Sequence, residues 1–332
     1  MRIGILTSGG DCPGINATIR GVCKTAINYY GMEVIGIHSG FQGLLTKDVE
    51  SITDKSLSGL LNLGGTMLGT SREKPFKKGG VVSDVDKPSL ILQNIHEIGL
   101  DCVVCIGGNG TQKTAAKFAA MGVNIVSVPK TIDNDLMGTD HTPGFGSAAK
   151  YVAASILEVV HDSLIYQLQS VTIIEIMGRN AGWLTAAAAL ARNEYNVAPD
   201  LIYLPEVVFD KDKFLADIHE VMKRKRCVVI AVSEGIRDQN GHFLDDDSKY
   251  AKKDAFGHVL HSGTGKLLES LVFKEFGCKV RSIELNVLQR CAMHIASKTD
   301  LNESFVIGSK AIDKALENVS GHVMGFKRLS NH

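Results

Sequence analysis

The chain has 332 residues, of which 44% are apolar and 22% charged, and its basic and acidic residues are equal in number. This composition is typical of a soluble globular protein, and the length predicts two domains rather than one. With a formal net charge of zero, nothing in the composition indicates the basic surface of a nucleic-acid-binding protein or a polybasic membrane patch, so we expect neither nucleic acid nor a membrane as a partner.

The N-terminus runs directly into an apolar stretch with a single arginine, so we expect no signal peptide. The longest apolar stretch, residues 181–191, is too short to span a bilayer and predicts a packed helix. Cys102 and Cys105 form a C-x-x-C, but in a strand pattern residues three apart face opposite sides. We therefore expect ordinary buried thiols and a reducing compartment, the cytoplasm.

The first part of the chain repeats a pattern of strand, glycine-rich turn and helix. The copies are "RIGILTSGGDCPGINATIRGVCKTAI", "MEVIGIHSGFQGLL", "DCVVCIGGNGTQKTAAKFAA" and the strand end "VNIVSVPKTIDND". Near-continuous apolar runs are typical of strands that are covered on both faces, and their alternation with helices predicts a doubly wound parallel sheet. Ligands of such sheets bind outside the carboxyl ends of the strands.

A second block of the same design follows Gly144. It contains the helix "SAAKYVAASILEVVHDSL", the strand "SVTIIEIMGRN", the helix "AGWLTAAAALARN", and the strands "CVVIAVSEGI" and "RSIELNVLQR". Residues 237–263 are polar and interrupt this rhythm, which predicts a long surface insertion. We therefore expect an α/β protein with two doubly wound, Rossmann-like lobes.

Glycine turns and cations mark the ends of the expected strands. Gly9-Gly10 and residues 107–111 ("GGNGT") each stand between a strand and a helix, where glycine admits a ligand and free N–H groups favour phosphate. Neither turn matches a G-x-G-x-x-G or G-x-x-x-x-G-K-[ST] signature. The cations that follow glycine turns or strands are Arg72, Lys130, Arg179, Arg281 and Arg290. Together they indicate more than one phosphate group.

Asp133 and Asp135 follow the strand that ends at Pro129. Alone, this pair is as typical of a solvated turn as of a site. Beside phosphate-binding groups, a metal ligand and a general base become the better interpretation. We predict that Asp133 takes the proton of a hydroxyl that attacks a phosphoryl group, with Mg²⁺ held by hard oxygen ligands.

Seven segments, in order, resemble the 6-phosphofructokinase family, in its group of mixed ATP and pyrophosphate enzymes: "LTSGGDCPGINATIRG", "GGTMLGTSR", "GGNGT", "PKTIDND", "GFGSA", "EIMGRNAGW" and "LQR". The resemblance implies the phosphofructokinase fold and phosphoryl transfer to O1 of fructose 6-phosphate in glycolysis. It also implies Mg²⁺ as cofactor and a homotetramer or homodimer. Residues 1–144 and 289–332 would form the larger, phosphoryl-donor-binding domain, and residues 145–288 the smaller, sugar-phosphate-binding domain.

The resemblance also assigns roles to single residues. The catalytic positions are Asp133 as general base, Thr131 and Arg179. The donor-binding positions are Gly10, Arg72, Gly108, Asn109, Gly110, Thr111 and Lys130. The sugar-phosphate-binding positions are Thr131, Asp133, Asp135, Met177, Gly178, Arg179, Glu234, Arg281 and Arg290. The implied metal ligands are Asn109 and Asp135, and Arg281 is implied to serve the site of a neighbouring subunit.

Three positions depart from the family pattern at the substrate sites. Asn109 stands where the family usually has an aspartate that binds the Mg²⁺ of the donor, and an amide oxygen ligates without charge. Ser170 and Val287 replace an arginine and a histidine, which implies a weaker hold on the 6-phosphate or a different sugar phosphate.

Two further departures concern regulation and the C-terminus. Arg20, Lys24, Lys223 and Lys225 match basic positions of the effector site in the bacterial enzymes, whereas Asp162 stands where a basic residue is usual. The chain stops soon after an expected strand, "GHVMGF", where the family continues with a closing helical segment.

The phosphoryl donor is indicated by two residues that disagree. In the family, glycine at the position of Gly110 accompanies ATP and aspartate accompanies pyrophosphate, whereas lysine at the position of Lys130 is usual in pyrophosphate enzymes. An aspartate about 4 Å from the α-phosphate of ATP would repel it by about 4 kcal/mol at an effective dielectric near 20. A flexible lysine attracts either donor, so we predict ATP, with pyrophosphate as the alternative.

Two other functions stay open at this point. Asn109, Ser170 and Val287 motivate a catalytically weakened protein that binds sugar phosphates or nucleotides, although a pure binder has no need of Asp133. The other is a kinase with a GGDGT-type donor loop, such as NAD kinase, which the full TIDND and MGR set disfavours.

Overall fold

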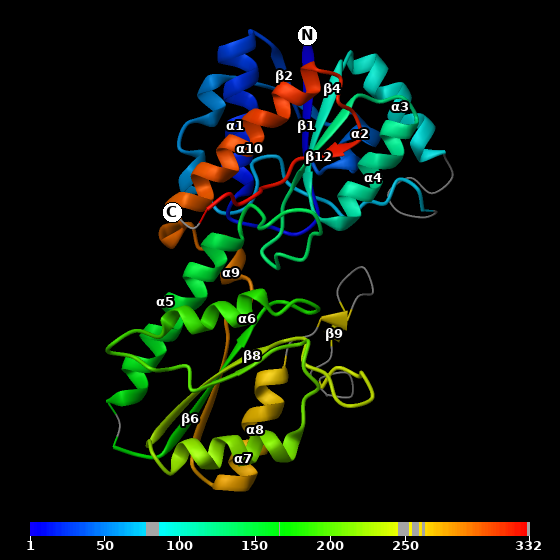
Figure 1. Ribbon diagram of the computed structural model, residues 1–332. Coiled ribbons are helices and arrows are strands. Elements are labelled where there is room, and N and C mark those ends of the chain that lie inside the picture. The colour runs from blue at the N-terminus through cyan, green and yellow to red at the C-terminus, as the bar shows by residue number, and fades with distance from the viewer. Residues whose placement is uncertain (78–85, 166, 245–251, 254–258, 261–262, 331–332) are drawn as a thin grey trace. The chain divides into compact units, whose positions relative to one another are not determined.

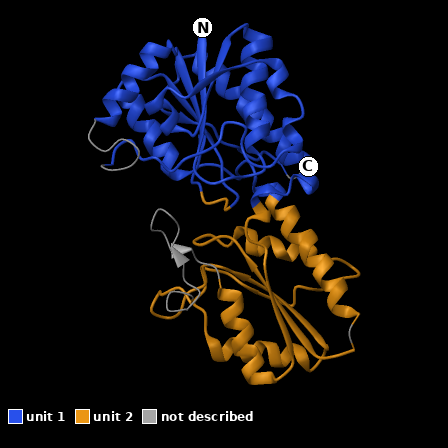
Figure 2. Cartoon of the chain, turned by 180° about the vertical axis from the view of Figure 1, so that it is seen from behind, with its two compact units in different colours: residues 1–132, 136–147, 290–332 blue, residues 133–135, 148–289 orange. Residues whose placement is uncertain are grey.

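The computed structural model describes residues 1–77, 86–165, 167–244, 252–253, 259–260 and 263–330. It divides into two compact units (Figure 2). Unit 1 comprises Met1–Ile132, Leu136–Ser147 and Arg290–His332, and unit 2 comprises Asp133–Asp135 and Ala148–Gln289. The binding role predicted for each domain stays a prediction.

Unit 1 is built on a six-stranded sheet with the order β12-β5-β4-β1-β2-β3. Its strands are β1 (Arg2–Ser8), β2 (Glu33–Ile37), β3 (Val49–Ile52), β4 (Cys102–Gly107), β5 (Ile125–Pro129) and β12 (His322–Val323). Neighbouring strands are parallel, except that β3 runs antiparallel to β2. The carboxyl ends of β1, β4 and β5 therefore meet at one edge, where the predicted glycine turns and Lys130 follow them.

Helices cover both faces of this sheet (Figure 1). Helices α1 (Ile15–Lys24) and α10 (Lys298–Leu316) pack together on one face, and α1 continues as a π-helical turn, Thr25–Tyr29. On the other face lie α2 (Phe41–Thr46), α3 (Lys87–Ile98) and α4 (Asn109–Ala120). Their apolar side chains bury a core against the strands that contains Leu6, Ile37, Phe41, Leu44, Ile91, Val103, Phe118 and Ile125.

Unit 2 is built on a parallel four-stranded sheet with the order β11-β6-β8-β7. Its strands are β6 (Ser170–Ile176), β7 (Leu201–Tyr203), β8 (Cys227–Ser233) and β11 (Lys279–Glu284). Helices α7 (Lys211–Met222) and α8 (Thr264–Phe276) bury a core on one face that includes Val171, Phe214, Ile218, Ile230 and Leu268. Helix α6 (Trp183–Ala187) covers the other face (Figure 1), and α5 (Phe145–Leu164) precedes the sheet in the chain. A separate antiparallel pair joins β9 (Lys252–Lys253) to β10 (Val259–Leu260).

These two parallel sheets with helices on both faces confirm the predicted α/β class, but three local predictions need correction. "RSIELNVLQR" is not one strand: β11 ends at Glu284 and Arg290 lies in the short helix α9 (Leu288–Cys291). The strand stops because Asn286 has a φ of +43°, a left-handed conformation that no strand residue adopts. Arg281, predicted to follow a strand, is the third residue of β11. The helix expected over residues 181–191 divides into α6 and a 3₁₀ turn, Ala188–Ala191.

The insertion expected at residues 237–263 lies only partly within the described residues, because 245–251, 254–258 and 261–262 are outside them. Among the helices that the structure describes, none combines the length and the apolar character that crossing a bilayer requires.

Candidate functional site

The turn after β1 collects two cations from distant parts of unit 1. Gly9 has a φ of +91°, which favours glycine, and a Cβ atom there would lie 3.6 Å from Lys130 Nζ. A Cβ atom on Gly10 would lie 3.6 Å from Arg290 Nη1. The buried Lys130 ammonium group donates a hydrogen bond to the Gly10 carbonyl oxygen. The turn therefore presents backbone groups and positive charge at the same place.

Asp11 is a member of this cluster that the sequence analysis missed. Its carboxylate accepts a hydrogen bond of 2.7 Å from the Cys12 N–H group. Burial raises the pKa of Asp11, while that hydrogen bond and the charges of Lys130 and Arg290 oppose the rise. The available signal was a carboxylate directly after a glycine pair at a strand end. Asp11 balances part of the positive charge that Lys130 and Arg290 bring to the turn.

The turn after β4 exposes the start of α4. Asn109 is the first residue of the helix, and both Asn109 and Gly110 are exposed to solvent. A Cβ atom on Gly110 would have no heavy atom within 4 Å, so the space in front of it is open. Thr111 is buried and its hydroxyl donates to the Ser8 carbonyl oxygen at 3.4 Å, which joins this turn to the end of β1. Free N–H groups at a helix start attract anions.

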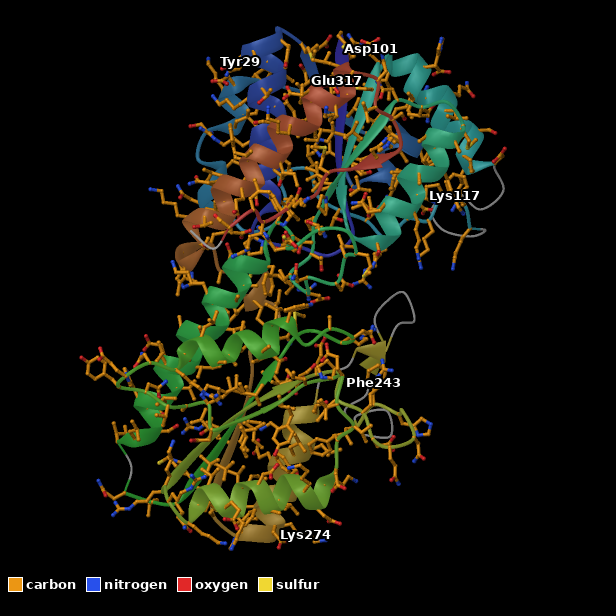
Figure 3. The ribbon with its side chains drawn as sticks, viewed as in Figure 1. Tyr29, Asp101, Lys117, Phe243, Lys274 and Glu317 are labelled. Carbon is orange, nitrogen blue, oxygen red and sulfur yellow. The ribbon has the colours of Figure 1, made fainter. Side chains whose placement is uncertain are left out.

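Arg72 is exposed, but the segment that carries it is anchored on both sides. Glu73 forms an ion pair of 2.6 Å with Lys87, and the two side chains are only 6% and 3% exposed. The Phe76 ring lies 4.8 Å below the ammonium group of Lys117, which projects from α4 (Figure 3). Breaking a buried ion pair by removing one partner costs about 3–5 kcal/mol, so this anchor holds Arg72 near the strand ends.

Carboxylates gather in unit 2. Glu175, on β6, is buried and accepts a hydrogen bond of 2.6 Å from the Gly265 N–H group. Glu234 follows β8 and accepts a longer hydrogen bond, 3.4 Å, from the Gly178 N–H group. Burial, followed by the negative charge of Asp133, raises the pKa of Glu234 to about 8; Glu175 adds to this rise and Arg179 opposes it. Asp133 and Glu234 thus belong to one electrostatic cluster.

Glu175 was also missed by the sequence analysis. Its signal was a single acidic residue inside the apolar run "TIIEI", where a charge is costly unless it is hydrogen-bonded. In the structure the Gly265 N–H group, in the first turn of α8, donates a hydrogen bond to this carboxylate. Its charge also acts on Glu234, one of the predicted site residues.

The turn after β6 carries Met177, Gly178 and Arg179. Gly178 has a φ of +126°, and a Cβ atom there would lie 2.4 Å from the Ala181 carbonyl oxygen, so only glycine fits. The Gly178 carbonyl oxygen accepts from the Ser233 hydroxyl at 2.8 Å. The Met177 N–H group donates to Gln289 Oε1 at 3.1 Å. These contacts hold the turn at the carboxyl edge of the unit 2 sheet.

Arg281 does not lie at this edge. It pairs in register with Thr172, the third residue of β6, and it forms an ion pair of 2.7 Å with Asp162. The turn with Arg179 follows the other end of β6. Within unit 2, the residues predicted to bind sugar phosphate therefore do not all lie at the carboxyl edge of the sheet.

The basic residues that match effector positions have partners within their own units. The contacts are Arg20 Nη1 to the Leu57 carbonyl oxygen (3.1 Å), Lys24 to Asp54 (2.6 Å), Lys223 to Glu220 (2.5 Å) and Lys225 to Asp200. An anionic effector would have to compete with these contacts.

Comparison with known proteins identifies the family. The model of the phosphofructokinase family matches residues 2–313. "ATP-dependent 6-phosphofructokinase 3" of Bacteroides thetaiotaomicron is 60% identical over 274 residues, which cover 80% of each chain. "Pyrophosphate--fructose 6-phosphate 1-phosphotransferase" of Dictyoglomus thermophilum is 37% identical over 328 residues, which cover 98% of this chain and 90% of that one.

A solved structure shows the same fold over nearly the whole chain. The pyrophosphate-dependent phosphofructokinase of Nitrosospira multiformis superposes with a TM-score of 0.84 at 29% identity, covering 99% of this chain and 80% of that one. The predicted fold class and the predicted family are thus confirmed. The chain belongs to the phosphofructokinase family.

Proposed function

We propose that this chain is an ATP-dependent 6-phosphofructokinase, which converts ATP and fructose 6-phosphate into ADP and fructose 1,6-bisphosphate. The observation that carries this proposal is the 60% identity to the ATP-dependent enzyme of Bacteroides thetaiotaomicron. In the reaction, O1 of the sugar attacks the γ-phosphorus atom, the bond to the bridging oxygen of ADP breaks, and the hydroxyl proton leaves.

Unit 1 offers the groups that a phosphoryl donor requires. Gly10, Gly108 and Gly110 give open backbone at strand ends, and Arg72 and Lys130 supply positive charge. The described residues also contain no acceptor for the buried Nε–H group of Arg290, which lies beside Gly10. A buried donor without an acceptor is costly, and an anionic ligand removes that cost. These groups bind the phosphates of the donor.

Unit 2 offers the groups that the acceptor sugar requires. Asp133 is the general base for the O1 proton, and its neighbour Glu234 has a pKa near 8, so Glu234 holds a proton at neutral pH. A neutral Glu234 accepts or donates a hydrogen bond to a sugar hydroxyl without adding a second negative charge beside Asp133. Arg179 stabilises the charge of the transferred phosphoryl group.

Asn109 in unit 1 and Asp135 in unit 2 each offer an exposed oxygen of the kind that Mg²⁺ binds. The described residues contain no cluster of three or more His, Cys, Asp or Glu side chains able to hold a metal ion alone. Mg²⁺ needs no such cluster, because it usually takes one or two protein oxygens, water and the phosphates of the substrate. Both side chains are exposed and so accessible to it. The ion would neutralise charge on the donor phosphates.

The sugar-phosphate site also draws on a second copy of the chain. Arg281 lies within β11, away from the edge that carries Arg179, and in this proposal it serves the site of a neighbouring subunit in a homodimer or homotetramer. Exposed apolar side chains support an oligomer, among them Trp183, Leu190, Tyr195 and Val197. The cysteines are free, which supports the cytoplasm as the compartment.

One assay tests the activity and its donor together. The purified chain is supplied with fructose 6-phosphate and Mg²⁺, and with either ATP or pyrophosphate, and fructose 1,6-bisphosphate is measured by a coupled reaction. We expect a higher kcat/KM with ATP. Turnover with pyrophosphate alone would overturn the donor and make Lys130 the better guide, and no turnover with either would overturn the function.

A further inference from the structure

A buried carboxylate outside the predicted site belongs to Asp300, a residue in the first turn of α10 that is only 3% exposed. Asp300 Oδ1 accepts a hydrogen bond of 2.8 Å from the Gly144 N–H group. Oδ2 accepts from the Ser147 N–H group at 3.2 Å and from the Ser147 hydroxyl. All of these atoms belong to unit 1. The carboxylate therefore caps the start of α5, a helix that is not its own.

The direction of the Ser147 hydroxyl bond can be assigned. Its oxygen accepts a hydrogen bond of 3.0 Å from the Ser297 N–H group, so its own proton points to Asp300. Burial raises the pKa of Asp300, and the hydrogen bonds from Ser147 and Gly144 oppose that rise by favouring the charged form.

Gly144 connects this carboxylate to the segment that carries the predicted catalytic residues. It forms an isolated parallel β-bridge with Thr131. The Thr142 hydroxyl, fully buried, donates a hydrogen bond of 2.7 Å to the Thr131 carbonyl oxygen. Residues 132–143 thus form a loop whose two ends are joined by these contacts, and Asp300 holds the second end at Gly144.

We propose that Asp300 is a positioning residue for phosphoryl transfer. Asp300 holds Gly144, and Gly144 in turn holds Thr131 through the β-bridge. Because Thr131 lies two residues before Asp133, Asp300 helps to fix the position of the general base. Helix α10 does not need this carboxylate for its own cap, because the Ser297 side chain already accepts from the Asp300 N–H group. The inference rests on the proposed function, since it assumes that Asp133 acts as the base.

The test is Asp300→Asn, which keeps an acceptor for Gly144 but replaces the acceptor for Ser147 with an NH₂ group. A displacement of about 1 Å can cost about 10²-fold in rate, so we expect kcat to fall by roughly 10- to 100-fold, with the KM for ATP nearly unchanged. Asp313→Asn is the matched control on the same helix, where the carboxylate contacts Tyr30 and Lys310 near the surface. It should leave kcat unchanged.

A double-mutant cycle separates positioning from general loss of stability. If Asp300 acts through Asp133, Asp300→Asn should lower kcat much less in an Asp133→Ser background than in the wild type. Equal fold-losses in both backgrounds would contradict the proposal. Thr142→Val, which keeps the shape and removes the hydroxyl that bonds the Thr131 carbonyl oxygen, should reproduce the kcat loss in part. If Asp300→Asn does not fold, the kcat of Thr142→Val tests the positioning role in its place.

Amide hydrogen exchange gives a readout that needs no activity. Asp300→Asn should accelerate exchange in peptides that cover residues 131–144, and Asp313→Asn should not. Unchanged exchange there would overturn the positioning role even if the chain were an active kinase. If Asp300→Asn exchanges faster but the wild type has no kinase activity, the structural role of Asp300 holds and the proposed function fails.

Discussion

The two sheets of this protein have the same parallel design but opposite chemistry at their carboxyl edges. In unit 1 the edge carries glycine turns and the cations Lys130 and Arg290, with Asp11 as a partial counter-charge. In unit 2 the corresponding edge carries the carboxyl groups of Glu175 and Glu234, and the negative charge of Asp133 contributes to the raised pKa of Glu234.

In the proposed function, this difference corresponds to the two tasks of the reaction. A phosphoryl donor is a polyanion, so its site needs N–H groups and cations that are held before the donor arrives. An acceptor hydroxyl must lose a proton, so its site needs a base within hydrogen-bond reach of that hydroxyl. One architecture supports both, because each sheet brings its strand ends together and leaves the side chains there free to differ.

The largest effect expected in the comparison of the two units comes from removing the predicted general base, Asp133. Asp133→Ser should lower kcat by roughly 10² to 10⁴, the usual contribution of a positioned base, with little change in the KM values. Asp212→Ser, on an exposed position of α7, is the control and should have no effect. Steady-state kinetics with both substrates decides this, and a mutant that keeps most of its kcat would remove Asp133 from the mechanism.

Adding a carboxylate to unit 1 should break its preference for ATP. Gly110→Asp has open space in front of it, so the fold should accept the side chain. A repulsion of about 4 kcal/mol would lower kcat/KM for ATP by up to roughly three decades and spare pyrophosphate. Gly110→Asn has nearly the same size without the charge, and it should lose far less. Equal losses for Asp and Asn would mean that bulk, not charge, decides the donor.

Removing a carboxylate from unit 2 should change how its stability depends on pH. The pKa of Glu234 is raised from its ordinary 4.5 to about 8, so the folded state binds the proton more tightly. That stability is fully present below pH 4.5 and is lost as the pH rises towards 8, by at most about 1.4 kcal/mol per pH unit.

Glu234→Gln should therefore flatten the decline of the unfolding free energy between pH 5 and 8, measured by urea denaturation. Glu220→Gln is the control, because Lys223 lowers the pKa of Glu220 and keeps it charged in this range. An identical pH profile for wild type and Glu234→Gln would show that this carboxylate is not perturbed.

The smallest expected effect concerns metal affinity in unit 1. Asn109→Asp places a charged oxygen at the start of α4, where a negative charge also suits the helix dipole by about 0.3–1 kcal/mol. The Mg²⁺ concentration for half-maximal activity should fall several-fold, and Asn109→Ala should raise it. An Asn109→Asp enzyme that needs more Mg²⁺ than the wild type would remove this position from the metal site.

Local patterns in the sequence were enough to predict the α/β class, the two lobes and the strand-end turns. Apolar runs of strand length and glycine at left-handed positions such as Gly9 and Gly178 depend on neighbours a few residues away, so they are visible without the fold. The same holds for the family, which the short motifs around Gly10, Asp133 and Arg179 already indicated.

Only the tertiary structure decided which side chains share an environment. Arg290 lies beside Gly10 because the chain re-enters unit 1 at Arg290, and Arg281 lies within the sheet of unit 2 because β11 pairs in register with β6. The raised pKa of Glu234, the burial of Glu175 and the hydrogen bonds of Asp300 likewise come from contacts between distant segments. Burial and pairwise charge act through space, and distance along the chain carries no information about them.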